Sequence, residues 1–263
     1  MNRIALRMDD VGASSKIFQQ YGLSNFKFNN NKFRISSRLT NFLFFKTFPI
    51  WKGWGPYNEL TPQEFESIFD FLSKNQIKMT IAITATWVDY DGNLIPYPEK
   101  FPEQSKLIKS AKEEGLLEIA NHGLTHCVIG KHLPRLFSTN QKYHREFWNW
   151  IPSEVHYEHL KRSQMLLQKY FDCPITTFVP PGNVYTEETI KAASSVGIKI
   201  INCNTSSRKI NNTWIIGNEN IFDFHDRDIT LYGIDWLETK IKEYSKREFC
   251  FIKDLTGNSQ IGK

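Results

Sequence analysis

Two short segments, far apart in the sequence, carry residue types that bind metal ions in proteins. Asp9 and Asp10 stand after an apolar run near the start of the chain, and His122 and His126 follow a second apolar run. A mixture of carboxylates and imidazoles suits Zn²⁺ or a similar borderline divalent ion. Active sites of barrel-like α/β folds assemble at the carboxyl ends of strands, and both segments follow expected strands. We therefore interpret the four side chains as one metal-assisted hydrolase site.

Each pair has a plainer interpretation when it is taken alone. The H-x-x-x-H spacing of His122 and His126 serves one metal from a helix or a wide turn, but it also arises by chance between ordinary, partly buried histidines. Gly123 favours a turn between a strand and a loop. Adjacent residues at a strand end point to opposite sides, so one of Asp9 and Asp10 can bind the metal while the other faces the water beside it. Together, the two pairs favour the functional interpretation.

Two later segments add groups suited to the same site. Residues 177–183 place two prolines and a glycine at another expected strand end, where glycine lets the backbone approach a ligand, although such residues also mark ordinary turns. His225 ends a late strand and is flanked by Asp223 and Asp226. Alone it is an ordinary surface or core histidine. Flanked by carboxylates, it acquires a raised pKa and can donate a proton.

The composition describes a globular protein and excludes several classes of function. The chain has 263 residues, of which 40% are hydrophobic and 14% aromatic, and its net charge is +5. The charges are spread along the chain, so we expect no nucleic-acid partner, whereas an anionic substrate such as a nucleotide-linked or lipid-linked sugar is compatible. No stretch approaches the roughly 18 apolar residues of a membrane span.

The cysteines and the start of the chain indicate a cytoplasmic protein. No secretory signal is visible, because the run before Asp9 is too short for the apolar part of one. The four cysteines show no C-x-x-C spacing, which is simplest to explain by reduced thiols. Cys127 follows His126 directly, and we interpret it as a small buried residue rather than as a fourth ligand.

Strand and helix alternate along the chain, which predicts a parallel sheet or barrel in one domain, residues 1–263. Thr61, Pro62 and Glu64 form a helix start, with a cap, a first-turn proline and a glutamate that reaches back. Other helices are expected over 103–114, 153–170, 186–196 and 236–244. Strands are expected over 4–6, 79–83, 116–120, 175–179, 198–201, 214–216, 221–224 and 249–253. Three long segments, 11–57, 84–102 and 127–152, should lie on a single rim.

Four of these segments, in this order, resemble the polysaccharide deacetylase family, the NodB-homology domain of carbohydrate esterase family four. The family has an Asp-Asp pair after the first strand, a metal motif of the H-S/T-x-x-H type, an Arg-x-Pro segment and a late strand that ends in Leu-x-His. The corresponding residues here are 8–12, 122–126, 178–183 and 222–225. The resemblance spans residues 4–225, and its first two motifs are the specific ones.

The resemblance implies a fold, a metal and a role for each site residue. The fold would be α/β, an incomplete or distorted (β/α)7-type barrel. Asp10, His122 and His126 would bind Zn²⁺, or another divalent ion such as Co²⁺, Ni²⁺ or Mn²⁺. Asp9 would be the general base and His225 the general acid. We expect the substrate to contact Pro181, Gly182, Asn183, Arg145, Glu146 and Trp54, with the Gly182 N–H as the candidate oxyanion donor.

This sequence departs from the family pattern at two places. Val179 stands where the family has the arginine that orients the catalytic aspartate, and Arg145, Arg208 or another cation is left to replace it. The D-x-x-D-W segment that supports the histidine is missing, and residues 202–204 stand there instead. The departures affect the pKa values of the general acid and the general base rather than the metal ligands. They suggest a divergent cytoplasmic branch of the family.

The leading hypothesis is a deacetylase that removes the N-acetyl group of an amino sugar in the biosynthesis of a surface polysaccharide or lipopolysaccharide. Its substrate would be an N-acetylated sugar or a sugar on a carrier. The aromatic residues of the first and third long segments suit stacking on sugar rings, although a small aromatic core under a loop explains them equally well. Two alternatives stay open: an amidohydrolase of a small ureide or cyclic imide, and a non-catalytic carbohydrate-binding relative.

Overall fold

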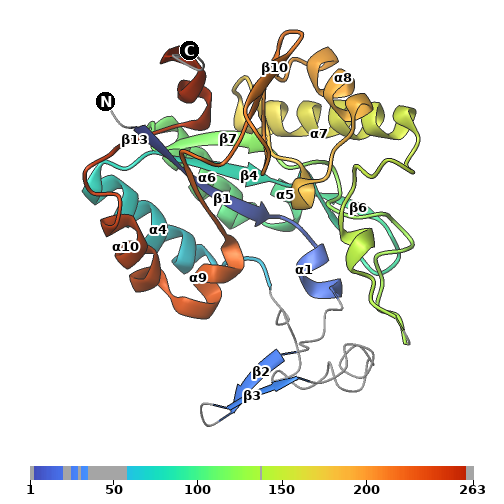
Figure 1. Cartoon of the computed structure of the whole chain (residues 1–263), viewed down its shortest axis with the longest axis horizontal. Helices are drawn as coiled ribbons and strands as arrows, with labels where there is room; N and C mark the ends of the chain where they lie inside the picture. Colours follow the sequence, from blue (N-terminus) through green and yellow to red (C-terminus); the bar gives the residue numbers. More distant parts are fainter. Residues whose placement is uncertain (1–2, 20–24, 29–30, 35–57, 137, 259–263) are drawn as a thin grey trace.

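A curved sheet of parallel strands forms the centre of the protein, which we describe from a computed structural model for residues 3–19, 25–28, 31–34, 58–136 and 138–258. Its seven principal strands follow one another in the order β11-β9-β8-β7-β4-β1-β12 (Figure 1). They are β1 (Arg3–Val11), β4 (Met79–Ile83), β7 (Leu117–Asn121), β8 (Thr177–Phe178), β9 (Ile200–Asn202), β11 (Thr213–Ile216) and β12 (Ile221–His225). Within the described residues β11 and β12 are not paired, so the sheet stays open there. The expected α/β fold, an incomplete (β/α)7-type barrel, is confirmed.

The curvature of the sheet brings distant strands within reach of one side chain. Arg7 on β1 donates a hydrogen bond to the Asn202 side chain on β9, although β4, β7 and β8 lie between these two strands. Neighbouring strands are about 4.8 Å apart, so four steps across a flat sheet would separate the two residues by roughly 19 Å. The interior of the incomplete barrel is therefore narrow, and polar side chains meet across it.

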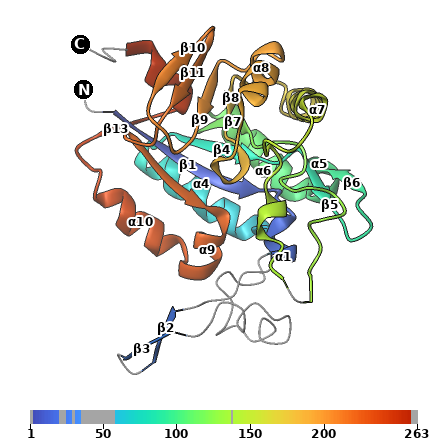
Figure 2. The same cartoon turned by 45° about the vertical axis from the view of Figure 1, so that its right-hand side comes forward.

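Helices cover the outside of the sheet. The longer ones are α4 (Pro62–Asn75), α6 (Pro102–Glu113), α7 (Ser153–Phe171), α8 (Glu187–Ser195), α9 (Asp226–Tyr232) and α10 (Ile234–Lys242). Figures 1 and 2 show α4 and α10 side by side on one flank of the sheet, and α7 with α8 on another. No helix of the described residues is long and apolar enough to cross a membrane.

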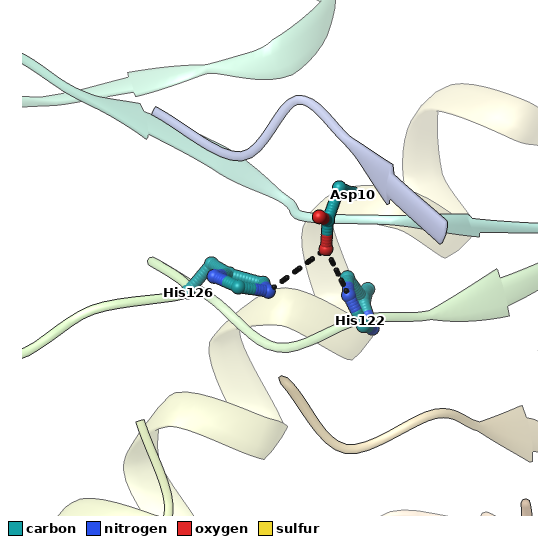
Figure 3. Close-up of side chains that lie close together, drawn as sticks. All are labelled: Asp10, His122 and His126. Carbon is teal, nitrogen blue, oxygen red and sulfur yellow. Dashed lines mark hydrogen bonds and ion pairs between the residues drawn. The ribbon is translucent and has the colours of Figure 1, made fainter. Parts of the chain in front are cut away.

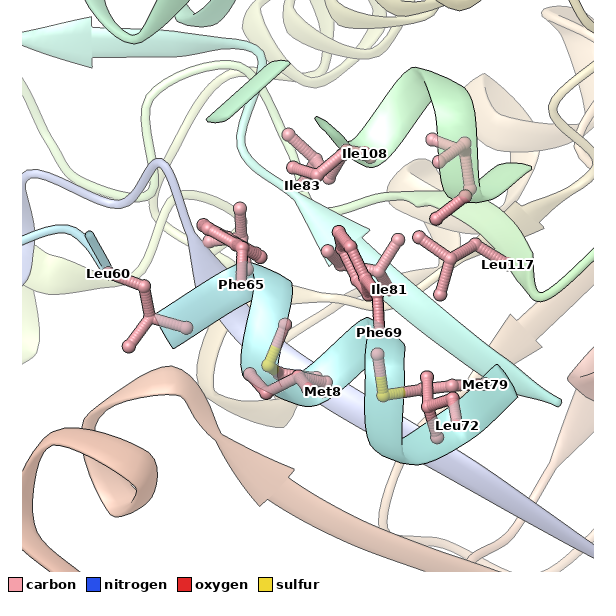
Figure 4. Close-up of a cluster of buried hydrophobic side chains, with 14 of the residues drawn as sticks. Met8, Leu60, Phe65, Phe69, Leu72, Met79, Ile81, Ile83, Ile108 and Leu117 are labelled. Atoms are coloured by element: carbon pink, nitrogen blue, oxygen red, sulfur yellow. The ribbon is translucent and has the colours of Figure 1, made fainter. Parts of the chain in front are cut away.

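The first of these helices illustrates how local sequence signals become packing. Thr61 and Glu64 cap the start of α4 reciprocally, and Pro62 occupies its first turn, as the sequence predicts. The apolar residues of α4 recur at helical spacing and form one buried face. This face packs on Met8, Met79 and Ile81 of the sheet within the main hydrophobic cluster (Figure 4). Full burial of one such side chain contributes about 1.5–3 kcal/mol, so this contact fixes α4 against β1 and β4.

Short elements occupy the long segments at the rim. The described part of residues 11–57 contains α1 (Ser15–Phe18) and the hairpin of β2 (Asn25–Phe28) and β3 (Asn31–Arg34). Residues 84–102 contain the hairpin of β5 (Thr86–Val88) and β6 (Leu94–Pro96), then α5 (Tyr97–Lys100). Residues 127–152 contain the 3₁₀ turn η2 (Gln141–His144).

The remaining strands and the last segment differ in part from expectation. β10 (Arg208–Ile210) pairs antiparallel with β11, and no strand was expected there. The expected strand 249–253 is shorter: β13 (Glu248–Cys250) pairs with the first residues of β1, and the 3₁₀ segment η4 (Ile252–Asn258) follows it. The expected helix 236–244 begins earlier, at Ile234, and a separate helix, α9, precedes it.

Candidate active site

A cavity opens where several of the parallel strands end. It is lined by Asp9 and Asp10 from the end of β1, by histidines from the loop after β7, by residues after β8, and by His225 at the end of β12. Its volume is about 120 Å³. Sites that enclose a whole small molecule have roughly 300–1,000 Å³, so this cavity accommodates a reacting group rather than a sugar chain.

Three predicted ligands converge in this cavity. Asp10 Oδ1 lies 3.3 Å from His122 Nε2 and 3.2 Å from His126 Nε2 (Figure 3). One ligand atom from each residue lies within 4.8 Å of the other two. Both imidazoles are buried, and the Asp10 side chain is 14% exposed. The structure thus brings together the three residues that the sequence analysis names as candidate metal ligands.

The chain reaches this arrangement through unusual backbone conformations. Asp10 has a φ of 70°, and the pairing of β1 with β4 shifts register between Met8 and Val11. A bulge of this kind re-aims a side chain at the end of a strand, so Asp9 and Asp10 both line the cavity instead of pointing to opposite faces. His126 also has a positive φ, of 54°. Such strained positions cost about 1–3 kcal/mol each and cluster at functional sites.

The donor set fits a divalent cation. His122 Nδ1 lies 2.6 Å from the Val179 carbonyl oxygen, which can only accept, so Nδ1 carries a proton and Nε2 of the neutral ring presents a lone pair. His126 Nδ1 bonds with the Ser15 hydroxyl at 2.9 Å, and its buried Nε2 has no hydrogen-bond partner among the described residues. The Nε2 atoms of two histidines thus face one carboxylate oxygen, an arrangement that suits a divalent cation.

Glu146 holds the loop that carries the histidines in place through hydrogen bonds. This buried carboxylate accepts hydrogen bonds from the backbone N–H groups of Leu124, Thr125 and His126, at 3.0–3.1 Å, and contacts His159 Nδ1 at 2.6 Å. Burial raises the pKa of Glu146, but the hydrogen bonds and the charge of His159 hold it below its ordinary value. We expected Glu146 to contact substrate; the structure instead places it under the loop and off the cavity wall, because its oxygens are committed to the backbone.

Asp9 is held by an arginine that the sequence analysis did not identify. The buried Arg7 binds both carboxylate oxygens of Asp9, with Nε–Oδ1 at 2.8 Å and Nη2–Oδ2 at 2.7 Å. It also bonds with Asn202 and, at 3.1 Å, with Asp223. A bidentate pair of this kind fixes orientation as well as charge. Arg7 thus holds Asp9 in a fixed orientation, as the family resemblance led us to expect of an arginine at the position of Val179.

A sequence signal for Arg7 did exist. Arg7 and Asp9 are two residues apart on one strand, so their side chains share a face. The two cations that we named as replacements lie elsewhere. Arg145 lines the cavity on the side of Gly182, and the exposed Arg208 donates hydrogen bonds to the side chains of the half-buried Tyr185 and Thr205.

His225 lies beside Asp9, because these two residues are register partners on the adjacent strands β12 and β1. Burial lowers the pKa of His225, but the carboxylates of Asp10, Asp228 and Asp9 outweigh it and raise the pKa to about 9. The expected partners were Asp223 and Asp226. Asp223 contacts Arg7, and Asp226 contacts Lys16, so Asp228 supplies the hydrogen bond instead.

A buried ionic cluster lies next to the site. The sequence gives no clear signal of it. Lys16 on α1 contacts Glu59 at 2.8 Å and also contacts Asp226, at the start of α9. Glu59 further accepts the Gly12 backbone N–H at 2.9 Å. Three segments that are distant in sequence are thereby joined next to Asp10. Arg227 Nη1 adds a contact of 3.2 Å to Asp10 Oδ2.

The remaining predicted substrate contacts are placed as follows. Gly182 and Asn183 line the cavity, both with positive φ, 59° and 58°. Pro181 is buried in the same 3₁₀ turn and does not line the cavity. Trp54 lies outside the described residues. Cys127 is a buried free thiol and is not part of the ligand group.

The family of this chain follows from its sequence. The family model described as polysaccharide deacetylase matches residues 53–201, more than half of the chain. The chain therefore belongs to the polysaccharide deacetylase family. A search of curated proteins finds no match.

Solved structures with a similar fold include three of different function. A CE4 family pseudoenzyme from Bacillus anthracis has 16% identity over 74% of this chain and 61% of its own, with a TM-score of 0.48. A family 4 acetyl xylan esterase from Clostridium thermocellum, in complex with a cobalt ion, has 13% identity over 76% and 87%, with 0.48. A 4-alpha-glucanotransferase from Thermococcus litoralis has 11% identity over 75% and 37%, with 0.50. The chain thus covers 61% of the length of the first structure, and at these identities the comparison shows a similar fold alone.

Glu146→Gln should destabilise the protein by about 2–3 kcal/mol, because an amide cannot accept all the hydrogen bonds that now satisfy the loop. Urea unfolding measures this change. Since the folded pKa of Glu146 is lowered from 4.5, its contribution is fully present above that pH and is lost as the pH falls through the folded value. The difference in free energy of unfolding between parent and variant should therefore shrink in acid.

Glu158→Gln, on the exposed face of α7, is the matched control and should change stability by less than about 0.5 kcal/mol. Equal effects of the two substitutions would contradict the assigned role.

Proposed function

We propose that this protein is a metal-dependent deacetylase that hydrolyses the N-acetyl group of an amino sugar. The observation that carries the proposal is the meeting of three groups in one small cavity: the ligand set of Asp10, His122 and His126, a carboxylate held by an arginine, and a histidine of raised pKa. Each group has a distinct part in hydrolysis of an amide.

Asp10, His122 and His126 would hold the metal, and Zn²⁺ is the ion that we favour over Co²⁺, Ni²⁺ and Mn²⁺. One carboxylate and two imidazoles are a donor set that zinc accepts readily, while other first-row metals use the same ligands. When bound, such an ion supplies Lewis acidity, which acidifies water and polarises a carbonyl. The protein contributes the fixed orientation of both rings, through Val179 and Ser15.

Asp9 would act as the general base. It lines the cavity beside the ligand set, and Arg7 holds its carboxylate in one orientation. A carboxylate offers about four lone-pair sites, and two of them face Arg7, so others are left to accept a proton from the attacking water. Preorganisation of this kind places the base correctly before the substrate arrives.

His225 would act as the general acid in the step that releases the amine. Although burial lowers the pKa of the ring, the carboxylates of Asp228 and Asp9 raise it, which favours the protonated form that can give a proton to the departing amine. The Gly182 N–H is our candidate donor to the oxyanion, because Gly182 lies in the wall of the cavity with its backbone in the left-handed region. Arg145 closes the wall beside it.

The biological setting that we propose is the cytoplasmic synthesis of a surface polysaccharide or lipopolysaccharide precursor. Membership of the polysaccharide deacetylase family supports a sugar substrate. The four cysteines are free thiols and three of them are buried, which is typical of proteins in a reducing compartment.

Acetate release from acetamido sugars tests the proposed activity. The parent should release acetate, and Asp9→Asn should lower kcat by about 10³-fold, because an amide cannot take the proton. Asp91→Asn, in an exposed turn, is the control and should behave as the parent. Release of product from small cyclic amides alone would favour the amidohydrolase alternative. Glycan binding without any turnover, unaffected by Asp9→Asn, would favour a binding protein.

Arg7→Lys should lower kcat by roughly 10²-fold, because lysine cannot hold both oxygens of Asp9 and a misplacement of about 1 Å has an effect of this size. KM should stay nearly constant, since Arg7 does not line the cavity. Steady-state acetate release measures both constants. Arg208→Lys is the matched control, on the exposed strand β10. A rise in KM with an unchanged kcat would contradict the positioning role.

A further inference from the structure

A surface next to the candidate active site gathers cations around aromatic rings. The ring of Tyr143 lies 4.5 Å from Arg135 Cζ, 5.0 Å from Lys142 Nζ and 5.8 Å from Lys131 Nζ. Lys131 Nζ also lies 5.4 Å from the ring of Trp150, which is 45% exposed and meets Tyr143 edge to face. We call these residues, Lys131, Arg135, Lys142, Tyr143 and Trp150, the cationic–aromatic strip.

The positive charge of the strip is not balanced by its own loop. Residues 127–152 contain one acidic side chain, Glu146. It is buried and bonded to backbone N–H groups and His159, so it does not neutralise the surface. Among the described residues, neither Lys131 nor Lys142 forms an ion pair with a carboxylate. Lys131 and Lys142 are like charges beside one ring and repel each other, and an anionic ligand would relieve that repulsion.

The strip and the catalytic cavity are formed in part by the same loop. Gln141, His144 and Arg145 line the cavity, whereas Lys142, between them in sequence, lies exposed on the strip. The loop is the yellow-green segment beside α1 in Figures 1 and 2, and the Asn140 side chain donates to the Phe18 carbonyl at the end of α1. The cavity has space for the reacting group alone, so the rest of a longer substrate must lie on the surface next to it.

We propose that the strip binds an anionic sugar residue of the substrate, so that the substrate class is an acetamido glycan that carries a carboxylate or phosphate near the reacting group. This inference rests on the proposed function. Lys131, Arg135 and Lys142 pair with the anion, and the exposed ring of Trp150 stacks on the ring of the sugar, while Tyr143 holds the cations in place. A sugar phosphate and a uronic acid present the same charge, and the substrates of the test separate them.

Steady-state acetate release measures the substrate preference. The substrates are a neutral acetamido tetrasaccharide, a tetrasaccharide of the same length that alternates with uronic acid, and an acetamido sugar phosphate. The parent should prefer an anionic substrate by at least tenfold in kcat/KM. The triple variant Lys131→Gln, Arg135→Gln, Lys142→Gln should lose most of that preference, chiefly through KM. The anionic substrate whose kcat/KM falls more in the triple variant shows whether the strip binds a carboxylate or a phosphate.

A charge-matched control removes exposed lysines elsewhere. The triple variant Lys106→Gln, Lys161→Gln, Lys169→Gln makes the same change in net charge on α6 and α7. It should keep the preference of the parent. An equal loss in both triple variants would reduce the effect to net charge, and no preference in the parent would overturn the proposal.

Direct binding separates this proposal from the proposed function. Calorimetry with the Asp9→Asn protein and the uronic-acid tetrasaccharide reports binding without turnover. If no acetamido sugar releases acetate but this binding is lost with the strip, the strip is supported and the deacetylase is not. If acetate is released equally from neutral and anionic substrates, the deacetylase stands and the strip does not.

Discussion

Two adjacent carboxylates lie at the end of β1 in a largely buried cavity, and a buried charge is costly unless a partner offsets it. Asp9 is paired through both oxygens with Arg7, whose own remaining donors reach Asn202 and Asp223. Asp10 faces two imidazoles and Arg227, and its pKa is held well below the ordinary value by the neighbouring histidines despite burial. The two carboxylates therefore differ in partner, and this difference supports our proposal that Asp9 transfers a proton and Asp10 binds the metal.

The same electrostatic requirement organises the segments around the site. Glu146 satisfies the backbone of the histidine loop, so that His126 keeps a left-handed conformation and aims Nε2 into the cavity. Lys16 joins α1 to α9 through Glu59 and Asp226, and α1 supplies the Ser15 hydroxyl that orients His126. These groups come from loops and from the short helices α1 and α9, which the strands bring together. A rigid site is thus built from irregular segments because buried charges tie them to one another.

Local signals in the sequence predicted the regular elements and the ligand set. The start of α4 was readable because a cap, a proline and a glutamate act within one turn. The residue types pointed to Asp9, Asp10, His122 and His126 as one group, and the family resemblance singled out Asp10 with the two histidines, which the structure brings together. Lys16 was missed because its partner Asp226 is 210 residues away in the sequence, and Glu146 was misassigned because only the folded loop shows that its oxygens bind backbone N–H groups. Arg7 was missed although it is only two residues from Asp9 on the same strand. The short elements α1, β5 and β10 were missed since three or four residues carry too little periodicity to be recognised.

Metal content is the most direct test of the central claim, that Asp10, His122 and His126 form a metal site. Elemental analysis of the purified parent should find about one divalent ion per chain, after loading with zinc if necessary. His122→Ala should lose that ion while it keeps the fold, and Asp91→Asn, in an exposed turn outside the ligand set, should retain it. A parent that binds no zinc, cobalt, nickel or manganese, or a His122→Ala protein that binds as much as the parent, would contradict the account.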